Sequence, residues 1–178
     1  MGVEQDAMMV AMQAPRAVVI VRGRGTFKAA PALKQFGLAA MEAGCTLLLL
    51  DMRECIGLDS TFMGVMGGLA VRLRKDKGGE LAMVNLSVKN KALLSTLGLD
   101  RCVKTEGAEG ELAAFLGNVE LAKLDATAAP RNVTTQTMLD AHHDLVSISP
   151  DNLAKFKDVL AYLQEETQRD REKDEKGG

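Results

Sequence analysis

Asp59, Ser60 and Thr61 are adjacent residues whose side chains could support chemistry. They come directly before a segment whose apolar residues recur at helical spacing, so they stand at a predicted helix N-terminus. An aspartate or serine at this position accepts a hydrogen bond from a free backbone N–H group and caps the helix. The free N–H groups and the helix dipole also stabilise an anion there. The residues alone therefore support two interpretations, a structural cap and a site for an anionic group.

Two other segments contain residue types that occur in metal sites or phosphate-binding loops. The pair His142–His143 has only Asp140 and Asp144 at ligand spacing, so we expect a solvated helix face and not a metal site. The Gly-Arg-Gly segment at 23–25 is too short for a phosphate-binding loop and lacks the lysine that would follow it. We therefore expect no catalytic residue, no metal and no cofactor, and we do not expect an enzyme.

Length, charge and cysteine content limit the class of protein. The chain has 178 residues and a formal net charge of −2, which gives no basic surface for nucleic acid and no attraction to an anionic membrane. Cys45, Cys55 and Cys102 are widely spaced among apolar neighbours, so we expect buried free thiols in a reducing compartment. The N-terminus has no signal-peptide pattern, and the longest apolar run is far shorter than the roughly 20 residues of a membrane span. These features predict a cytoplasmic location.

Alternating strand and helix patterns extend over the first two thirds of the chain. Residues rich in β-branched or apolar types predict strands at 7–12, 17–22, 45–51, 80–85 and 102–104. Helical spacing predicts helices at 28–43, 60–75, 88–97 and 109–124. The segments 23–26 and 52–58 are predicted to be a break and a loop. Two strands followed by repeated helix and strand indicate an α/β fold with a single mixed sheet and helices mostly on one face.

The predicted helix after Ser60 contains three glycines, Gly64, Gly67 and Gly68. Each glycine inside a helix costs up to about 1 kcal/mol relative to alanine. Either this helix is merely weak, or it lies very close to a sheet or to a partner. We favour close packing.

The chain changes character after residue 124. A linker-like segment precedes two helical patterns, and the apolar residues of the second form a stripe made of Leu153, Phe156, Leu160 and Leu163. This stripe is expected to pack on the first helix of the pair and on the rest of the chain or a second subunit. The final residues are almost all polar and are expected to fray. The predicted organisation is a folded unit at 7–118, a linker at 119–134, a helical hairpin at 135–170 and a disordered tail at 171–178.

Two motifs together resemble the STAS domain of bacterial anti-sigma factor antagonists. The segment 51–67, DMRECIGLDSTFMGVMG, is similar to the family signature, in which a hydrophobic strand and short loop lead to Asp-Ser-Ser/Thr at a helix start. The segment 78–99 is similar to the family's stretch of Gly-Gly, strand, serine, helix and Gly-Leu. The resemblance covers roughly residues 7–118 and implies a STAS fold for them. Phe62 stands where the family usually has glycine, and the segment 23–26 lacks the acidic residues often found after the second strand.

The resemblance also implies a function. In that family the anti-sigma factor is a serine kinase that phosphorylates the serine after the aspartate, which is Ser60 here. The implied partner-binding residues are those at and after the helix start, namely Asp59, Ser60, Thr61, Phe62 and Met63. We therefore expect an anti-sigma factor antagonist that binds an anti-sigma kinase and is switched at Ser60. The alternative is a non-phosphorylated STAS scaffold or adaptor that docks onto a signalling complex or forms a homo-oligomer through its C-terminal helices.

Overall fold

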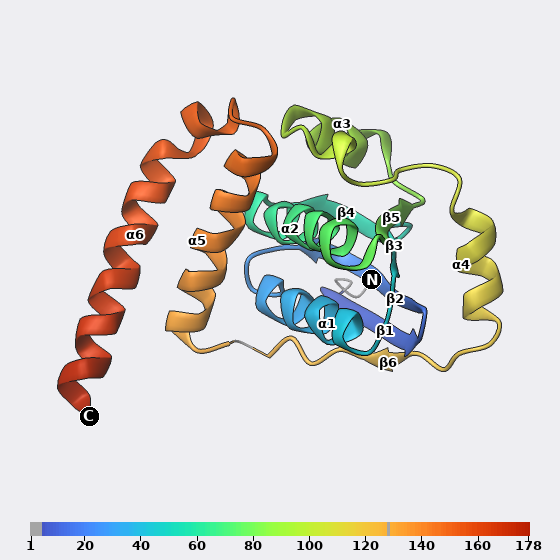
Figure 1. The fold of residues 1–178 in the computed structure, drawn as a ribbon, viewed down its shortest axis with the longest axis horizontal. Helices are drawn as coiled ribbons and strands as arrows, with labels where there is room; N and C mark the ends of the chain where they lie inside the picture. The colour runs from blue at the N-terminus through green and yellow to red at the C-terminus, as the bar shows by residue number, and fades with distance from the viewer. Residues whose placement is uncertain (1–4, 128) are drawn as a thin grey trace.

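One mixed sheet forms the centre of the computed structural model, which describes residues 5–127 and 129–178 (Figure 1). Its strands lie in the spatial order β5-β3-β2-β1-β6, with β4 beside β2. β1 and β2 are antiparallel, whereas β2, β3 and β5 run parallel. The strand bounds are β1 (Ala7–Gln13), β2 (Arg16–Gly25), β3 (Leu47–Asp51), β4 (Cys55–Leu58), β5 (Glu80–Val84) and β6 (Ala122–Lys123). The prediction of a single mixed sheet is confirmed.

The central strands are buried on both faces of the sheet. Val18 and Leu49 face the smaller apolar cluster, whereas Val19 and Leu50 face the main core. This two-sided burial explains why β2 and β3 read as continuous apolar runs with no polar alternation.

Helices cover the two faces unequally. In Figure 1, α1 and α2 lie over one face and α5 stands beside them, whereas α4 lies at the far side of the sheet. Leu112 and Phe115 of α4 belong to the smaller cluster, together with the opposite faces of β2 and β3. The prediction of helices mostly on one face is confirmed. The helix bounds are α1 (Ala30–Glu42), α2 (Ser60–Lys77), α3 (Val88–Thr96), α4 (Glu109–Leu116), α5 (Arg131–Ile148) and α6 (Asn152–Gly177).

The sheet differs from the sequence prediction at three places. The segment 23–26 does not break β2, because 55–58 forms β4 and pairs in parallel with the end of β2. Residues 102–104 form no regular strand and contribute only an isolated bridge between Ala82 and Lys104. The helix predicted at 109–124 ends at Leu116, after which β6 pairs antiparallel with β1. All three errors involve pairing between distant segments, which local patterns do not report.

The last helix is longer than predicted. α6 continues to Gly177, so the prediction of a disordered tail at 171–178 is wrong in this structure. Its end is rich in strong helix formers and has side-chain contacts one turn apart. Gln168 donates to Glu172 at 3.1 Å, and Arg169 lies 3.7 Å from Glu165. No helix within residues 5–127 and 129–178 is both long and apolar enough to cross a membrane.

The C-terminal helices pack onto the sheet-bearing unit. Ala141 and Leu145 of α5 are buried in the same core as α2 and the sheet. On α6, Leu160 and Leu163 are buried against α5, and Phe156 is half-buried. Leu153 remains exposed, so the predicted stripe packs only in part. The pair α5–α6 is therefore continuous with the rest of the fold (Figure 1).

Candidate functional site

Asp59 caps α2 and ties it to the loop that precedes α1. Its Oδ1 accepts a hydrogen bond from the backbone N–H of Phe62 at 2.8 Å. Its Oδ2 accepts one from the backbone N–H of Phe27 at 2.6 Å. The capping role follows from the local sequence, because a carboxylate in this position satisfies N–H groups that the helix leaves free. Ser60 is consequently held as the first residue of α2.

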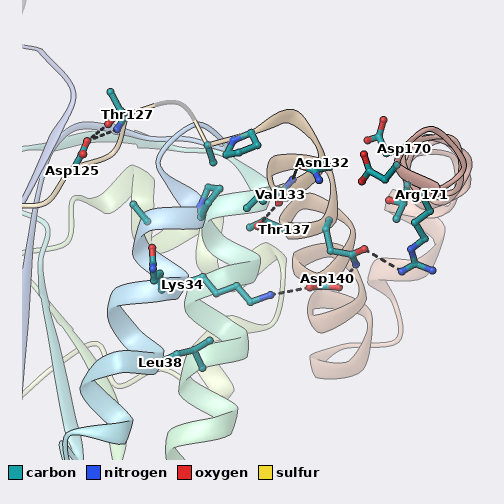
Figure 2. Close-up of a pocket in the computed structure, with 18 residues that line it drawn as sticks. Lys34, Leu38, Asp125, Thr127, Asn132, Val133, Thr137, Asp140, Asp170 and Arg171 are labelled. Atoms are coloured by element: carbon teal, nitrogen blue, oxygen red, sulfur yellow. Dashed lines mark hydrogen bonds and ion pairs between the residues drawn. The ribbon is translucent and has the colours of Figure 1, made fainter. Parts of the chain in front are cut away.

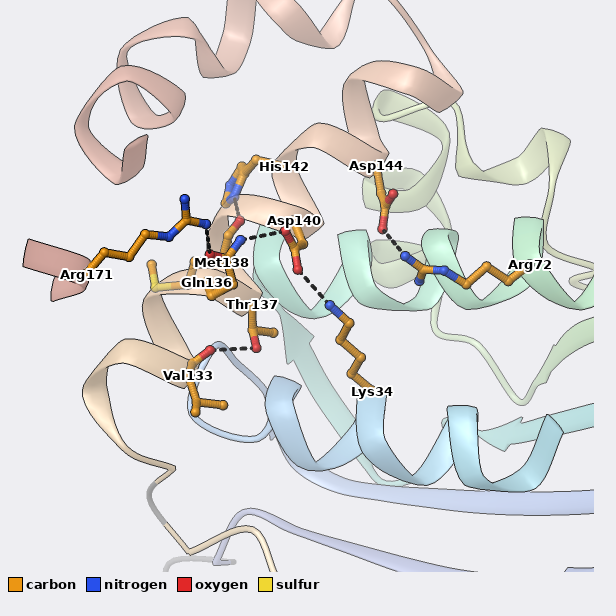
Figure 3. A network of polar contacts seen from close by, with 10 residues as sticks. All are labelled: Lys34, Arg72, Val133, Gln136, Thr137, Met138, Asp140, His142, Asp144 and Arg171. Atoms are coloured by element: carbon orange, nitrogen blue, oxygen red, sulfur yellow. Dashed lines mark hydrogen bonds and ion pairs between the residues drawn. The ribbon is translucent and has the colours of Figure 1, made fainter. Parts of the chain in front are cut away.

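Ser60 is half-buried and contacts a histidine from α5. Its Oγ lies 3.0 Å from Nε2 of His142, whose side chain is only 2 % exposed. The other ring nitrogen, Nδ1, lies 2.7 Å from the carbonyl oxygen of Met138, a contact drawn in Figure 3. Because a carbonyl oxygen can only accept, Nδ1 carries a proton, and in the neutral imidazole Nε2 then accepts a hydrogen bond from the Ser60 hydroxyl. The ring of Phe156 packs edge-on against this imidazole at a centroid distance of 4.9 Å.

The glycines of α2 leave room for α5. A β-carbon on Gly64 would meet the carbonyl oxygen of Ala141, which is backbone and cannot turn aside. A β-carbon on Gly68 would meet the carboxylate of Asp144. The two helices therefore approach so closely that a side chain at Gly64 would clash with backbone, whereas one at Gly68 would have to displace the Asp144 side chain.

Gly67 extends the same surface toward the end of α5. A β-carbon there would lie 2.6 Å from Cδ1 of Ile148 and 2.7 Å from Cδ2 of Leu99. The prediction of close packing is confirmed, but the element that α2 meets at these glycines is chiefly α5 of the same chain, and not the sheet or a partner as expected. We call the surface of α2 that faces α5 the glycine face; its residues are Ser60, Gly64, Gly67, Gly68 and Arg72.

Charged side chains at the edges of α5 join it to α1 and α2 (Figure 3). Nζ of Lys34 lies 2.8 Å from Asp140, which also accepts from Gln136 at 2.8 Å. Arg72 lies 3.9 Å from Asp144. Burial raises the pKa of the Asp144 carboxyl, and the charge of Arg72 opposes that rise. The ion pairs are partly exposed, so each contributes little to the free energy of unfolding.

Three of the predicted partner-binding residues lie inside the fold. Thr61, Phe62 and Met63 are buried, and the Phe62 ring packs against Leu58 and the α-carbon of Gly25. These three side chains are therefore not accessible to a partner in this structure, and their predicted contact with one stays a prediction. The reason is helical geometry, since a residue directly after the cap turns its side chain either to the sheet or to α5. Of the predicted set, Asp59 and Ser60 are the half-buried members.

His142 is buried, so the expectation of a solvated helix face is wrong for this residue, which enters the site through tertiary packing. The signal present in the sequence was the run of glycines in α2, which indicated a close neighbour without identifying it. Both ring nitrogens of His142 are engaged in hydrogen bonds, and His143 is exposed on the other side of α5. Cys45, Cys55 and Cys102 are free and buried, and burial raises the pKa of each thiol.

An open groove lies between α1, α5, α6 and the segment that leads into α5 (Figure 2). Its volume is about 860 Å³, and its walls carry charges of both signs, including Lys34, Asp125, Asp140 and Arg171. No residue of the predicted site lines this groove in the described part of the chain. The groove is therefore separate from the N-terminus of α2.

Solved structures of anti-sigma factor antagonists share this fold. A putative antagonist from Thermotoga maritima is 19% identical over 61% of this chain and 93% of that chain, with a TM-score of 0.52. The antagonist SpoIIAA in its unphosphorylated form is 17% identical over 64% of this chain and 100% of its own, with a TM-score of 0.52. The Bacillus protein SpoIIAA in its phosphorylated form is also 17% identical, over 62% and 99% of the two chains, with a TM-score of 0.50. At this identity the likeness establishes the fold alone.

The sequence match identifies the domain. No curated relative matches the chain. The family model described as "Mlab, STAS domain" matches residues 8–106, more than half of the chain. These residues run from β1 to just beyond the isolated bridge at Lys104 and include Ser60. The chain belongs to the STAS-domain family.

Proposed function

We propose that this protein is an anti-sigma factor antagonist that binds an anti-sigma serine kinase and is switched by phosphorylation of Ser60. The observation that carries the proposal is the position of Ser60, directly after the Asp59 cap at the start of α2 in a STAS domain. SpoIIAA, whose fold is similar, is known in unphosphorylated and phosphorylated forms. The protein would act in the cytoplasm as a binding module, without catalysis of its own.

The chemistry of the switch is a phosphoryl transfer. The γ-phosphoryl group of ATP would pass to Oγ of Ser60, which loses its proton, and ADP would leave. The product carries about −1.5 to −2 charges at pH 7. The N-terminus of α2 tolerates this charge, because helix N–H groups and the dipole favour an anion. A partner that packs on the same place must desolvate the charge, so binding weakens.

A scaffold or adaptor without phosphorylation is the second candidate. Two observations favour it. The Ser60 hydroxyl is engaged by His142 and is only half-exposed. The outer side of α6 also exposes Leu153, Val159 and Tyr162, which a second copy or a signalling complex could cover.

Capture and phosphosite mapping from the native host test the proposal. The tagged full chain would be used as wild type, Ser60→Ala and Ser60→Asp, with Gln13→Glu as a control that adds charge at an exposed site on β1. We expect wild type and Ser60→Ala to capture an anti-sigma kinase, Ser60→Asp to lose it, and phosphate to map to Ser60. If Ser60 carries no phosphate and Ser60→Asp captures the same proteins as wild type, the scaffold replaces the switch.

A further inference from the structure

The glycine face of α2 has the shape of a surface that receives a helix. We propose that it is a helix-docking surface which the chain's own α5 covers reversibly, so that a partner reaches Ser60 only when α5 leaves. The identity of the partner rests on the function proposed above. The release of α5 does not, and it can be measured without a partner.

The first support comes from the contacts that a side chain would make if it replaced each glycine of α2. The atoms that a side chain at Gly64 or Gly68 would meet first belong to α5. Elsewhere the fold uses glycine differently: at Gly37 a side chain would meet Leu69, within the core that joins α1 and α2. Glycine is unfavourable in a helix. Its repeated use on this one face of α2 is explained by the close approach of another helix.

The second support comes from the length of the chain. SpoIIAA aligns over 100% of its own length with 64% of this chain, and the family model ends at residue 106. More than a third of this protein therefore has no counterpart in that antagonist. α5 begins at Arg131, beyond the residues that the family model matches, so it is an addition to the STAS domain.

The third support is that α5 and a modified Ser60 exclude each other. Nε2 of His142 accepts a hydrogen bond from the Ser60 hydroxyl, and the imidazole is 2 % exposed. Phosphoryl transfer from ATP removes that proton, so this hydrogen bond is lost unless the imidazole takes up a second proton. The phosphate would also need the space that His142 occupies. Modification of Ser60 therefore favours the uncovered state, and by reciprocal linkage docked α5 disfavours modification.

The contacts that α5 makes with α2 also indicate which features a partner helix needs in order to bind in its place. Ala141 lies opposite Gly64, and Asp144, three residues later, lies near Arg72. We infer that the competing partner presents a helix with a small residue followed three positions later by a carboxylate. A bulky residue at the first position would be kept out by the same backbone contact that restricts Gly64.

The labelling rate of a cysteine at position 60, introduced as Ser60→Cys, measures whether α5 covers this position. The native cysteines are all buried, so the thiol of Ser60→Cys gives the main fast reaction with Ellman's reagent. In the full chain, Gly64→Met should wedge α5 away and raise the labelling rate about tenfold or more. Gly110→Ala is the matched control, because it also changes a helix glycine but has nothing within 4 Å of its β-carbon. An equal rate with and without Gly64→Met overturns the proposal.

A second pair of variants guards against loss of folding. Asp144→Lys places a positive charge near Arg72 and should also speed labelling, whereas His143→Lys adds charge on the exposed side of α5 and should not. Hydrogen exchange should show that the amides of β2 and β3 stay protected in every variant while those of α5 exchange faster. If α5 and the sheet always lose protection together, α5 is a permanent part of the core and the proposal is wrong.

The two proposals fail in distinguishable ways. If the variants that displace α5 raise the labelling rate at Ser60→Cys while no kinase modifies Ser60, the helix-docking surface is supported and the antagonist function is contradicted. If a purified cognate kinase modifies wild type and Gly64→Met at equal rates and labelling is unchanged, the function stands and the reversible cover falls.

Discussion

Ser60 on α2 donates a hydrogen bond to Nε2 of His142 on α5, across 82 positions of the chain. The bond needs the neutral imidazole whose Nδ1–H donates to the carbonyl oxygen of Met138. It links the residue that a kinase would modify to a helix outside the matched STAS segment. The stability of the C-terminal helices and the state of Ser60 are therefore coupled.

Ser60→Asp should destabilise the protein more than Ser60→Ala does. An aspartate near a helix N-terminus contributes about 0.3–1 kcal/mol of stabilisation. The carboxylate lacks the hydroxyl proton, so the contact with Nε2 of His142 is lost unless the buried imidazole takes up a second proton, and that loss costs about 1–3 kcal/mol, which is the larger effect. Urea unfolding followed by circular dichroism measures the difference. Equal midpoints for the two variants would show that the Ser60–His142 contact carries no such coupling.

Gly64→Ala and Gly110→Ala should have opposite effects on stability. The new methyl group at Gly64 meets the backbone of Ala141, and overpacking of this kind costs about 1–3 kcal/mol. At Gly110 in α4 the methyl group meets open space, so the better helix propensity of alanine should add up to about 1 kcal/mol. The midpoints of urea unfolding measure both effects. A higher stability of Gly64→Ala than of wild type would mean that α5 lies farther from α2 than described.

The contribution of Asp144 to stability should fall as pH rises. Burial raises the pKa of this carboxyl in the folded state above its ordinary value of 3.8, so the folded protein holds the proton more tightly than the unfolded chain. Stability from this group is complete below the unfolded pKa and is lost as pH rises through the folded pKa. The side chain in Asp144→Asn does not titrate. The free energy of unfolding of this variant should therefore rise relative to that of wild type between pH 4 and pH 7. A difference that stays constant over this range would contradict the assignment.

Removal of α5 and α6 after Leu124 should leave a less stable protein that associates. The truncation removes Ala141 and Leu145 from the main core and uncovers the glycine face on which they pack. We expect a lower melting temperature, a larger mass by light scattering and binding of a hydrophobic dye. Truncation after Asp170 is the control, because it keeps the buried Leu160 and Leu163 and should change none of these measurements. A fully monomeric 1–124 chain with an unchanged melting temperature would show that α5 contributes nothing to the core.

The parts of the fold that were predicted correctly are those with local signals. Asp59 caps α2 as expected, since its carboxylate accepts a hydrogen bond from the N–H group three residues ahead. β4 was missed because its four residues become a strand only by pairing with the end of β2. The three errors in the sheet therefore share a physical cause, which is pairing between segments far apart in sequence.

The candidate site was predicted only in part for a related reason. Asp59 and Ser60 are defined by a helix start, which a short motif reveals. The glycines indicated that another element packs closely on α2. No local pattern identifies that element as α5, which carries His142 and Ala141. Burial of Phe62 also depends on Gly25, which comes from β2. These relationships are tertiary and appear only once the helices are placed on the sheet.

The covalent connection between β6 and α5 sets the strength with which α5 competes for its own docking face. While residues 124–130 join the two parts, α5 is present at an effective concentration on the order of millimolar, whatever its intrinsic affinity. A single peptide-bond cleavage between Lys123 and Arg131, both exposed, would turn this into an encounter between separate molecules. At cellular concentrations the cleaved α5–α6 fragment would be a much poorer competitor. Proteolysis of the tether would thus raise the partner's apparent affinity for α2 without changing any residue that the partner contacts.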